Sequence, residues 1–268
     1  MDTAALAGEL LEARDHARLV GLPSERPGGL TLEQAFEVAE AIRQRRMAAG
    51  DEPRGYKIGF TNRTLWPRYG VFAPIWAPVR RSTVTLLDDT EAQVSMTGLV
   101  QPRLEPEIVF GFARAPRPGM TESELVDCLD WVAHGFEVVH THFADWRFAA
   151  ADTVADFALH GRLCIGPRVP VARFARLGEE LAALRLSLLR DGEVVDSGVG
   201  ANVLDGPLTA LRLWLEAMSV HTPQWNVRQG DVVTTGTITD AWPMRPGQVW
   251  RSRPDHAALH GLTLRAVP

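Results

Sequence analysis

The chain has 268 residues, of which 46% are hydrophobic and 23% charged, which is typical of an ordinary soluble globular protein. Its formal net charge of −5 argues against a nucleic-acid partner. No apolar run approaches the roughly 20 residues needed to span a bilayer, and the N-terminus lacks the basic start of a signal peptide. Cys128 and Cys164 are isolated thiols, which fits a reducing compartment, so we expect a cytoplasmic protein.

The N-terminal part predicts a small, mainly helical lobe. Residues 3–20 have helical composition, and a capping box at 31–34 opens a second helix that stops at Gly50. A short strand follows at 54–60, and residues 67–78, rich in proline and aromatic side chains, suggest a lid or a lobe junction. We therefore divide the chain into an N-terminal lobe of residues 1–75 and a β-rich body of residues 76–268.

The body is predicted to consist of many short strands and few helices. A capping box at 121–124 predicts a helix to about Ala133, and Pro207 opens another helix to about Ser219. Residues 88–98 are polar and predict a loop. The expected strands are 80–87, 104–112, 135–139, 162–165, 184–189, 194–197, 232–237, 248–251 and 262–266. This pattern indicates an α+β protein.

Three glutamates lie in two apolar, strand-like stretches. Glu105 and Glu107 are two residues apart, so alternation along a strand places them on one face, about 7 Å apart. Glu137 lies between apolar neighbours, where a lone carboxylate is strongly penalised for losing water. All-oxygen ligands favour a hard ion, so we predict that the three hold Mg²⁺ or Mn²⁺. Such an ion would bind a chelating substrate, for example a 2-oxo acid.

Two alternatives remain open for these acidic residues. A pair of strand glutamates is common on a solvated sheet face. Zinc on His140 and His142 is the rival metal site, but strand alternation points Glu137 away from His140.

A single lysine stands out in the composition. Lys57 is the only lysine among the 28 basic residues, and Gly55 and Gly59 flank it on a short strand. The pKa of a buried lysine can shift enough for proton transfer, whereas arginine stays charged. We predict Lys57 as a catalytic residue, with chance use of lysine as the alternative.

Further polar groups are candidates for the site. Residues 140–161 are dense in polar side chains, from which we select Asp156 and His160 as acid–base candidates. A buried hydrogen-bond network supporting the sheet is the alternative. Residues 235–237 end a strand and offer backbone N–H groups to a carboxylate, unless they form an ordinary tight turn. The sequence shows no Walker loop or dinucleotide fingerprint, which argues against a nucleotide cofactor.

Several motifs occur in a specific order and together resemble a known family. They are Gly55-Tyr56-Lys57-Ile58-Gly59, Glu105-Pro106-Glu107-Ile108, Glu137 with Asp145-Trp146, Asp152-Thr153-Val154-Ala155-Asp156, Gly200-Ala201-Asn202-Val203-Leu204, and Gly230-Asp231 to Gly236. The chain is similar to the 2-keto-4-pentenoate hydratase / 2-oxohepta-3-ene-1,7-dioate hydratase / 4-oxalocrotonate decarboxylase group of the fumarylacetoacetate hydrolase superfamily.

The resemblance implies a mixed β-roll catalytic body with a small N-terminal lobe. It also implies Mg²⁺ or Mn²⁺ on Glu105, Glu107 and Glu137, with Lys57 beside the substrate. The implied reaction adds water to a 2-hydroxy-2,4-dienoate and gives a 4-hydroxy-2-oxo acid in aromatic catabolism. We expect substrate contacts from Leu104, Thr235, Gly236 and Thr237, and a homo-oligomer with no membrane partner.

The sequence departs from the family directly after Asp156. Many hydratases continue with Asn and shortly afterwards Ser, where this chain has Phe157, Leu159 and His160. This difference leaves the substrate and the proton relay open. The alternatives are a 2-oxo acid decarboxylase, an acylpyruvate carbon–carbon hydrolase, and a catalytically silent relative with an assembly or binding role.

Overall fold

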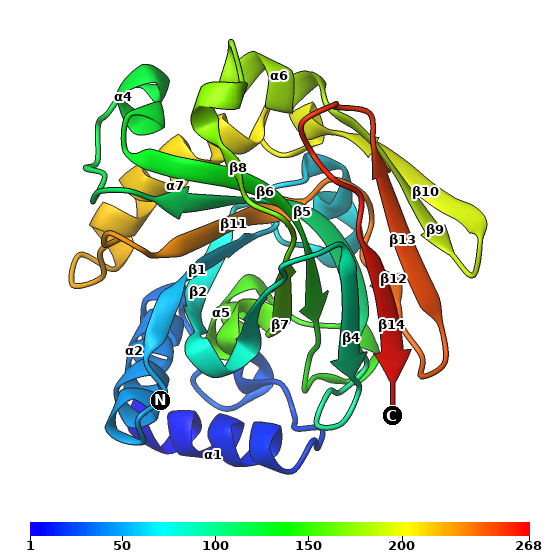
Figure 1. The fold of residues 1–268 in the computed structure, drawn as a ribbon. Helices are drawn as coiled ribbons and strands as arrows, with labels where there is room; N and C mark the ends of the chain where they lie inside the picture. The colour runs from blue at the N-terminus through cyan, green and yellow to red at the C-terminus, as the bar shows by residue number, and fades with distance from the viewer.

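Two β-sheets form the centre of the computed structural model, which describes all 268 residues (Figure 1). The nine-stranded sheet runs in the order β2 (Ile75–Arg80), β1 (Pro53–Gly59), β11 (Val232–Thr237), β5 (Arg103–Phe112), β6 (Leu129–Val139), β7 (His160–Ile165), β3 (Val84–Leu86), with β12 (Trp242–Pro243) beside β5 and β8 (Val169–Pro170) beside β6. The five-stranded sheet runs in the order β10 (Glu193–Val199), β9 (Arg185–Arg190), β13 (Val249–Pro254), β14 (Thr263–Val267), β4 (Glu91–Ser95).

Helices cover the edges and faces of these sheets. They are α1 (Thr3–Asp15), α2 (Leu32–Ala48), α3 (Trp66–Tyr69), α4 (Glu122–Val126), α5 (Ala150–Ala155), α6 (Leu177–Ala183) and α7 (Pro207–His221). In Figure 1, α1 and α2 lie together at the lower left, where α2 also contacts α5, and α7 lies against β11. No helix has both the length and the apolar character needed to cross a membrane.

One hydrophobic core joins the N-terminal helices to the sheets. A continuous cluster of 60 buried residues includes Leu10 of α1, Phe36 of α2 and Trp214 of α7. Strand β1, which the sequence analysis placed in the N-terminal lobe, lies inside the larger sheet between β2 and β11. The N-terminal helices therefore share their core with the body, and the division at residue 75 stays a prediction.

Two local predictions were wrong, and the strand expected at 80–87 is interrupted by a 3₁₀ turn at Arg81–Thr83, which leaves only Val84–Leu86 as the separate strand β3. The helix expected to reach Ala133 ends at Val126, because Leu129 and the residues after it pair with β5 instead. The expected loop at 88–98 contains strand β4, in which Ala92 and Val94 are buried and every residue pairs with β14. In both cases a partner strand far away in the sequence decides the local structure.

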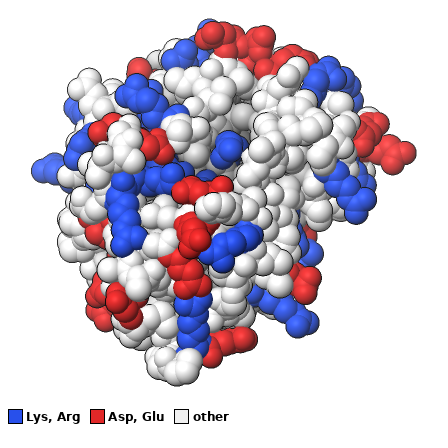
Figure 2. All heavy atoms as spheres, turned by 90° about the horizontal axis from the view of Figure 1, so that it is seen from below, with Lys and Arg blue, Asp and Glu red and all other residues white.

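Charged side chains of both signs are interspersed on the face seen in Figure 2. Neither the basic nor the acidic groups form a continuous patch over this face. This distribution is the one expected for a chain whose formal net charge is only −5.

The parallel pairing of β1 with β11 depends on Gly55. Gly55 has a φ of +137°, and a Cβ at this position would lie 1.8 Å from the carbonyl oxygen of Val232. Gly55→Ala is therefore expected to lower the free energy of unfolding by about 2 kcal/mol or more in urea titrations followed by circular dichroism.

Gly98→Ala is the matched control. Gly98 also has a positive φ, of +77°, but a Cβ there meets open space. We expect a loss of only about 1 kcal/mol from the left-handed backbone conformation. Equal losses in the two variants would contradict the importance of the close approach between β1 and β11.

Candidate metal centre and active site

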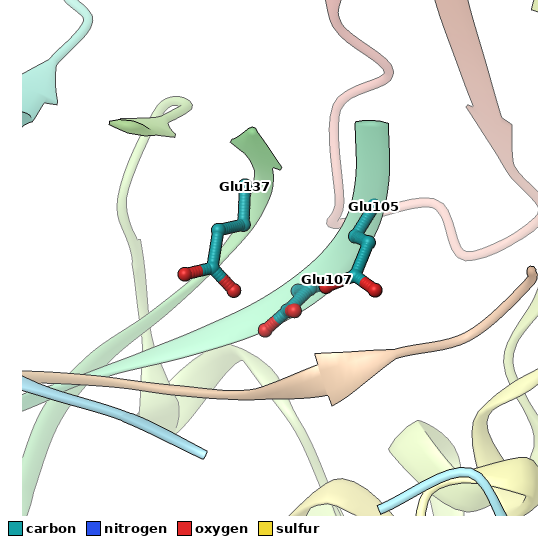
Figure 3. Close-up of side chains that lie close together, drawn as sticks. All are labelled: Glu105, Glu107 and Glu137. Atoms are coloured by element: carbon teal, nitrogen blue, oxygen red, sulfur yellow. The ribbon is translucent and has the colours of Figure 1, made fainter. Parts of the chain in front are cut away.

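Strand pairing brings the three glutamates together. Glu105 and Glu137 are direct partners across the antiparallel strands β5 and β6, and Glu107 lies opposite Gly135 on the same face. One carboxylate oxygen from each glutamate lies within 4.8 Å of the other two (Figure 3). Glu107 and Glu137 are fully buried, and Glu105 is partly exposed.

Lys57 is the cation next to this trio. Its Nζ lies 3.3 Å from Oε2 of Glu137 and donates a hydrogen bond of 2.9 Å to the carbonyl oxygen of Ala158. Burial by itself would lower the pKa of Lys57, but the charges of Glu137, Glu105 and Glu107 outweigh it and raise the pKa above its ordinary value. The side chain is therefore a charged ammonium group in a nearly closed environment.

One ammonium group does not neutralise three carboxylates. Burial raises the pKa of Glu105 to about 7 against the attraction of Lys57, and burial with the charge of Glu137 raises the pKa of Glu107 well above its ordinary value. For Glu137, burial is outweighed by Lys57 and His160, which hold its pKa below the ordinary value. The surplus negative charge favours a divalent cation.

The hydrogen bonds of the two buried glutamates fit a metal site. Oε2 of Glu107 accepts hydrogen bonds from Thr234 Oγ1 and from the backbone N–H of Gly236, the latter at 2.8 Å. Oε1 of Glu107 and Oε2 of Glu137 are buried without a hydrogen-bond donor. Each carboxylate thus has one oxygen fixed by hydrogen bonds and one oxygen without a hydrogen-bond donor, which is the arrangement expected of metal ligands. The second oxygen of Glu137 already has one cation nearby, the ammonium group of Lys57 at 3.3 Å.

His160 orients Glu137 from behind. Its Nδ1 lies 2.7 Å from Oε1 of Glu137, and its Nε2 lies 2.8 Å from Oγ1 of Thr83. Burial lowers the pKa of His160 to about 4, so the ring is neutral at pH 7 and donates its single proton to the carboxylate. A buried histidine that donates to a ligand carboxylate fixes the direction of that carboxylate.

Asp156 lies in a separate hydrogen-bond network. One carboxylate oxygen accepts from the backbone N–H of His142 at 3.0 Å and from Oγ1 of Thr141, and the other lies 2.5 Å from Nδ1 of His142. Nδ1 of His140 accepts from the backbone N–H of Val100. No group of three possible metal ligands includes either of these histidines, so nothing in the structure favours the zinc alternative.

A narrow cleft opens beside Lys57 and Glu105. Its lining is mostly apolar and aromatic and consists of Lys57, Gly59, Phe60, Asn62, Leu65, Tyr69, Glu105, Val139, Trp146, Leu159, Thr237 and Ala241. Lys57 is the only cationic side chain in this lining. The cleft therefore has a charged end, at the glutamates and Lys57, and an apolar remainder.

The predicted substrate contacts fall in different places. Thr237 lines the cleft, whereas Leu104 is buried in the core. The hydroxyl of Thr235 donates to the carbonyl oxygen of Ile108, and the N–H of Gly236 donates to Glu107. Neither Asp156 nor His160 lines the cleft, so both contact protein groups rather than the space for a substrate.

The aromatic walls of the cleft were not selected from the sequence. Tyr69 stacks on Phe148 with ring centroids 6.0 Å apart, and Trp146 lies 6.3 Å from Tyr69. The hydroxyl of Tyr69 accepts a hydrogen bond of 2.6 Å from Arg103. Tyr69 lies in the stretch 67–78, whose proline and aromatic residues were interpreted above as a lid or lobe junction, so that composition was the available signal for this wall.

Sequence comparison decides the family. No family model matches the chain. The 2-keto-4-pentenoate hydratase of Burkholderia vietnamiensis is 31% identical over 240 residues, which cover 88% of this chain and 87% of that protein. The chain belongs to this hydratase family. The 2-hydroxyhexa-2,4-dienoate hydratase of Comamonas testosteroni is 28% identical over 239 residues, covering 89% of this chain and 88% of that protein.

A solved structure supports the same family and the α+β fold. The 4-oxalocrotonate decarboxylase of Pseudomonas putida G7, complexed with magnesium and adipate, superposes with a TM-score of 0.89 at 25% identity. The match covers 99% of this chain and 97% of that chain. The resemblance inferred from the ordered motifs and the predicted fold class are therefore confirmed.

Mg²⁺ is expected to stabilise this hydratase-family protein against heat. An ion that binds only the folded state at 100 times its Kd adds about 2.7 kcal/mol to the free energy of unfolding. Scanning calorimetry of chelator-treated protein should show a rise in Tm with Mg²⁺ that Glu105→Gln largely removes, because one ligand is lost.

Glu193→Gln is the control, since Glu193 is an exposed glutamate at the start of β10. It should keep the full Mg²⁺ response. A Glu105→Gln variant that responds like the unmodified protein would place the stabilising ion outside the trio.

Proposed function

We propose that this protein is a metal-dependent hydro-lyase that adds water to a 2-hydroxy-2,4-dienoate, giving a 4-hydroxy-2-oxo acid in aromatic catabolism. The observation that carries the proposal is the cluster of three glutamates beside Lys57, of which Glu105 and Lys57 line a mostly apolar cleft. Relatives named as hydratases of this substrate class support it.

Glu105, Glu107 and Glu137 are the proposed metal ligands, and Mg²⁺ or Mn²⁺ is the proposed ion. When bound, such an ion supplies Lewis-acid stabilisation of the negative charge that develops on the 2-oxo acid end of the substrate. The hydrogen bonds from Thr234, Gly236 and His160 hold the carboxylates of Glu107 and Glu137 in place before substrate arrives, each through the oxygen that does not face the proposed ion.

Lys57 is the proposed catalytic residue. Its ammonium group is the only cation in the cleft lining, so it attracts the anionic end of the substrate. Held by Ala158 and Glu137, Nζ has a defined direction and can donate a proton to a carbon of the dienol while the 2-hydroxyl group loses its proton to water, which gives the 2-oxo form. The apolar walls exclude bulk water and orient the diene for the addition of a single water molecule.

The remaining predicted site residues receive different proposed roles. Thr237 is proposed to contact the substrate, because it lines the cleft. Gly236 and Thr235 act through the backbone around Glu107, and Leu104 acts through the core beneath β5. His160 and Asp156 are proposed as positioning residues, since their side chains contact protein groups. Cytoplasmic location and homo-oligomer formation stay predictions.

Decarboxylation of a 2-oxo acid is the second candidate, favoured by the similarity to 4-oxalocrotonate decarboxylase. The cleft argues for hydration, because a substrate with a second carboxylate would meet no cation besides Lys57 in the lining.

Paired assays decide between hydration and decarboxylation. Water addition to an alkyl-substituted 2-hydroxydienoate should exceed carbon dioxide release from a 2-oxo dicarboxylate, and the reverse order would overturn the preference for hydration.

Glu107→Gln is expected to abolish turnover. The change keeps the size of the side chain but removes the charge of a central ligand, so kcat/KM with Mg²⁺ should fall by more than about 100-fold. Circular dichroism should show an intact fold. Glu193→Gln serves again as the control with normal activity.

Metal-stimulated turnover retained by Glu107→Gln would reject the proposed metal centre. Absence of Mg²⁺-dependent turnover by the unmodified protein on a panel of 2-oxo acids and 2-hydroxydienoates would favour the catalytically silent alternative. Cleavage of an acylpyruvate in that panel would indicate the hydrolase instead.

A further inference from the structure

Three consecutive residues between α5 and β7 have left-handed backbone conformations. Phe157, Ala158 and Leu159 have φ values of 57°, 47° and 66°, and none of them is glycine. Such conformations are unfavourable for residues with a Cβ and persist only where the surroundings enforce them.

The turn 157–159 supplies three contacts to the site. The carbonyl oxygen of Ala158 accepts the hydrogen bond from Nζ of Lys57 at 2.9 Å, and Leu159 lines the cleft. His160, which directly follows, contacts Glu137. A shift of this turn would therefore move the groups that orient Lys57 and one wall of the cleft.

Arg14, in the last turn of α1, holds the turn from the side of the N-terminal helices. The residue is only 8% exposed, and no carboxylate lies within ion-pair distance of its guanidinium. Its Nη1 donates a hydrogen bond of 2.8 Å to the carbonyl oxygen of His160, and its guanidinium carbon lies 4.4 Å from the centroid of the Phe157 ring. Its contacts thus bracket the turn at both ends.

The neighbouring charges do not provide another partner for Arg14. Arg80 also lies near the Phe157 ring, at 5.7 Å, but it pairs with Asp51. Burial and the charge of Arg80 lower the pKa of Arg14 to about 9, and the charge of Asp156 opposes this only in part. The carboxylate of Asp156 is engaged with Thr141 and His142. Burying a cation without a partner carboxylate costs free energy. We therefore look for the role of Arg14 in the two contacts that it makes, with Phe157 and with the carbonyl oxygen of His160.

We propose that Arg14 is a positioning residue for the reaction: it clamps the turn 157–159 through Phe157 and His160, and thereby holds the carbonyl oxygen of Ala158 against Lys57. The effect on catalysis rests on the proposed function, because it assumes that Lys57 is the catalytic residue. The contacts by which Arg14 holds the turn do not depend on that assumption. The rival interpretation is that Arg14 only anchors α1 to the core.

Arg14→Met tests the clamp, because methionine fills similar apolar space without the hydrogen bond or the charge. Exchange of backbone amides in peptides covering 156–160 should accelerate relative to the unmodified protein. With Mg²⁺ and a 2-hydroxydienoate, kcat should fall by about 10- to 100-fold, since a misplacement of the order of 1 Å costs this much. KM and the Mg²⁺ affinity measured by calorimetry should change less than kcat, because Glu105 and Glu107 are held by contacts outside the turn.

Arg18→Met is the matched control. Arg18 lies just beyond α1 and forms an exposed ion pair with Glu12, away from the turn. It should leave kcat and amide exchange at 156–160 unchanged. Arg14→Lys, which keeps the charge but loses the flat stacking group, should give an intermediate loss and serves in place of Arg14→Met if the latter does not fold.

A double-mutant cycle with Phe157→Leu separates the clamp from simple anchoring. If Arg14 acts through the Phe157 ring, the loss of kcat in the double variant should be smaller than the product of the two single losses. Loss of Tm in Arg14→Met with unchanged kcat and unchanged exchange at 156–160 would overturn the proposal. If the unmodified protein is inactive on every dienoate, the proposed function fails, while the exchange measurement still decides the clamp.

Discussion

Repulsion among three glutamates in a site with little water is the constraint on which the rest of the structure depends. Like charges repel strongly where the local dielectric is low. Burial already raises the pKa values of Glu105 and Glu107, and Lys57 offsets only one of the three charges. The site therefore has an excess of negative charge. The two buried carboxylate oxygens without hydrogen-bond donors mark the place where a cation would bind.

Distant parts of the chain cooperate to keep this arrangement. Strands β5 and β6 supply the glutamates, β1 supplies Lys57, and β11 supplies Thr234 and Gly236, which fix Glu107. The turn 157–159 orients Lys57 from the other side. Because Glu107, Glu137 and Lys57 are held before any ligand binds, little reorganisation of these groups is needed during reaction, which is the main source of electrostatic catalysis.

That the three glutamates and Lys57 lie close together could be expected from the sequence, because the signals are local: alternation along a strand, apolar neighbours, and one lysine among many arginines. Their roles stay predictions. The aromatic wall formed by Tyr69 and Trp146 could not be predicted from the sequence, because it depends on which segments meet in the folded chain. Arg14 lies 146 residues from the carbonyl that it contacts, so no local pattern marks it. The prediction of a helix as far as Ala133 was wrong for the same reason: the residues from Leu129 onward pair with β5, which is distant in the local pattern and overrides the helical spacing.

The most direct test of the central claim is a crystal structure grown with Mn²⁺ and oxalate, with anomalous scattering used to locate the ion. One manganese peak is expected in contact with carboxylate oxygens of Glu105, Glu107 and Glu137, with oxalate bound to it on the side of Lys57. Glutamate side chains turned apart, or a peak elsewhere with none between the three, would contradict the claim.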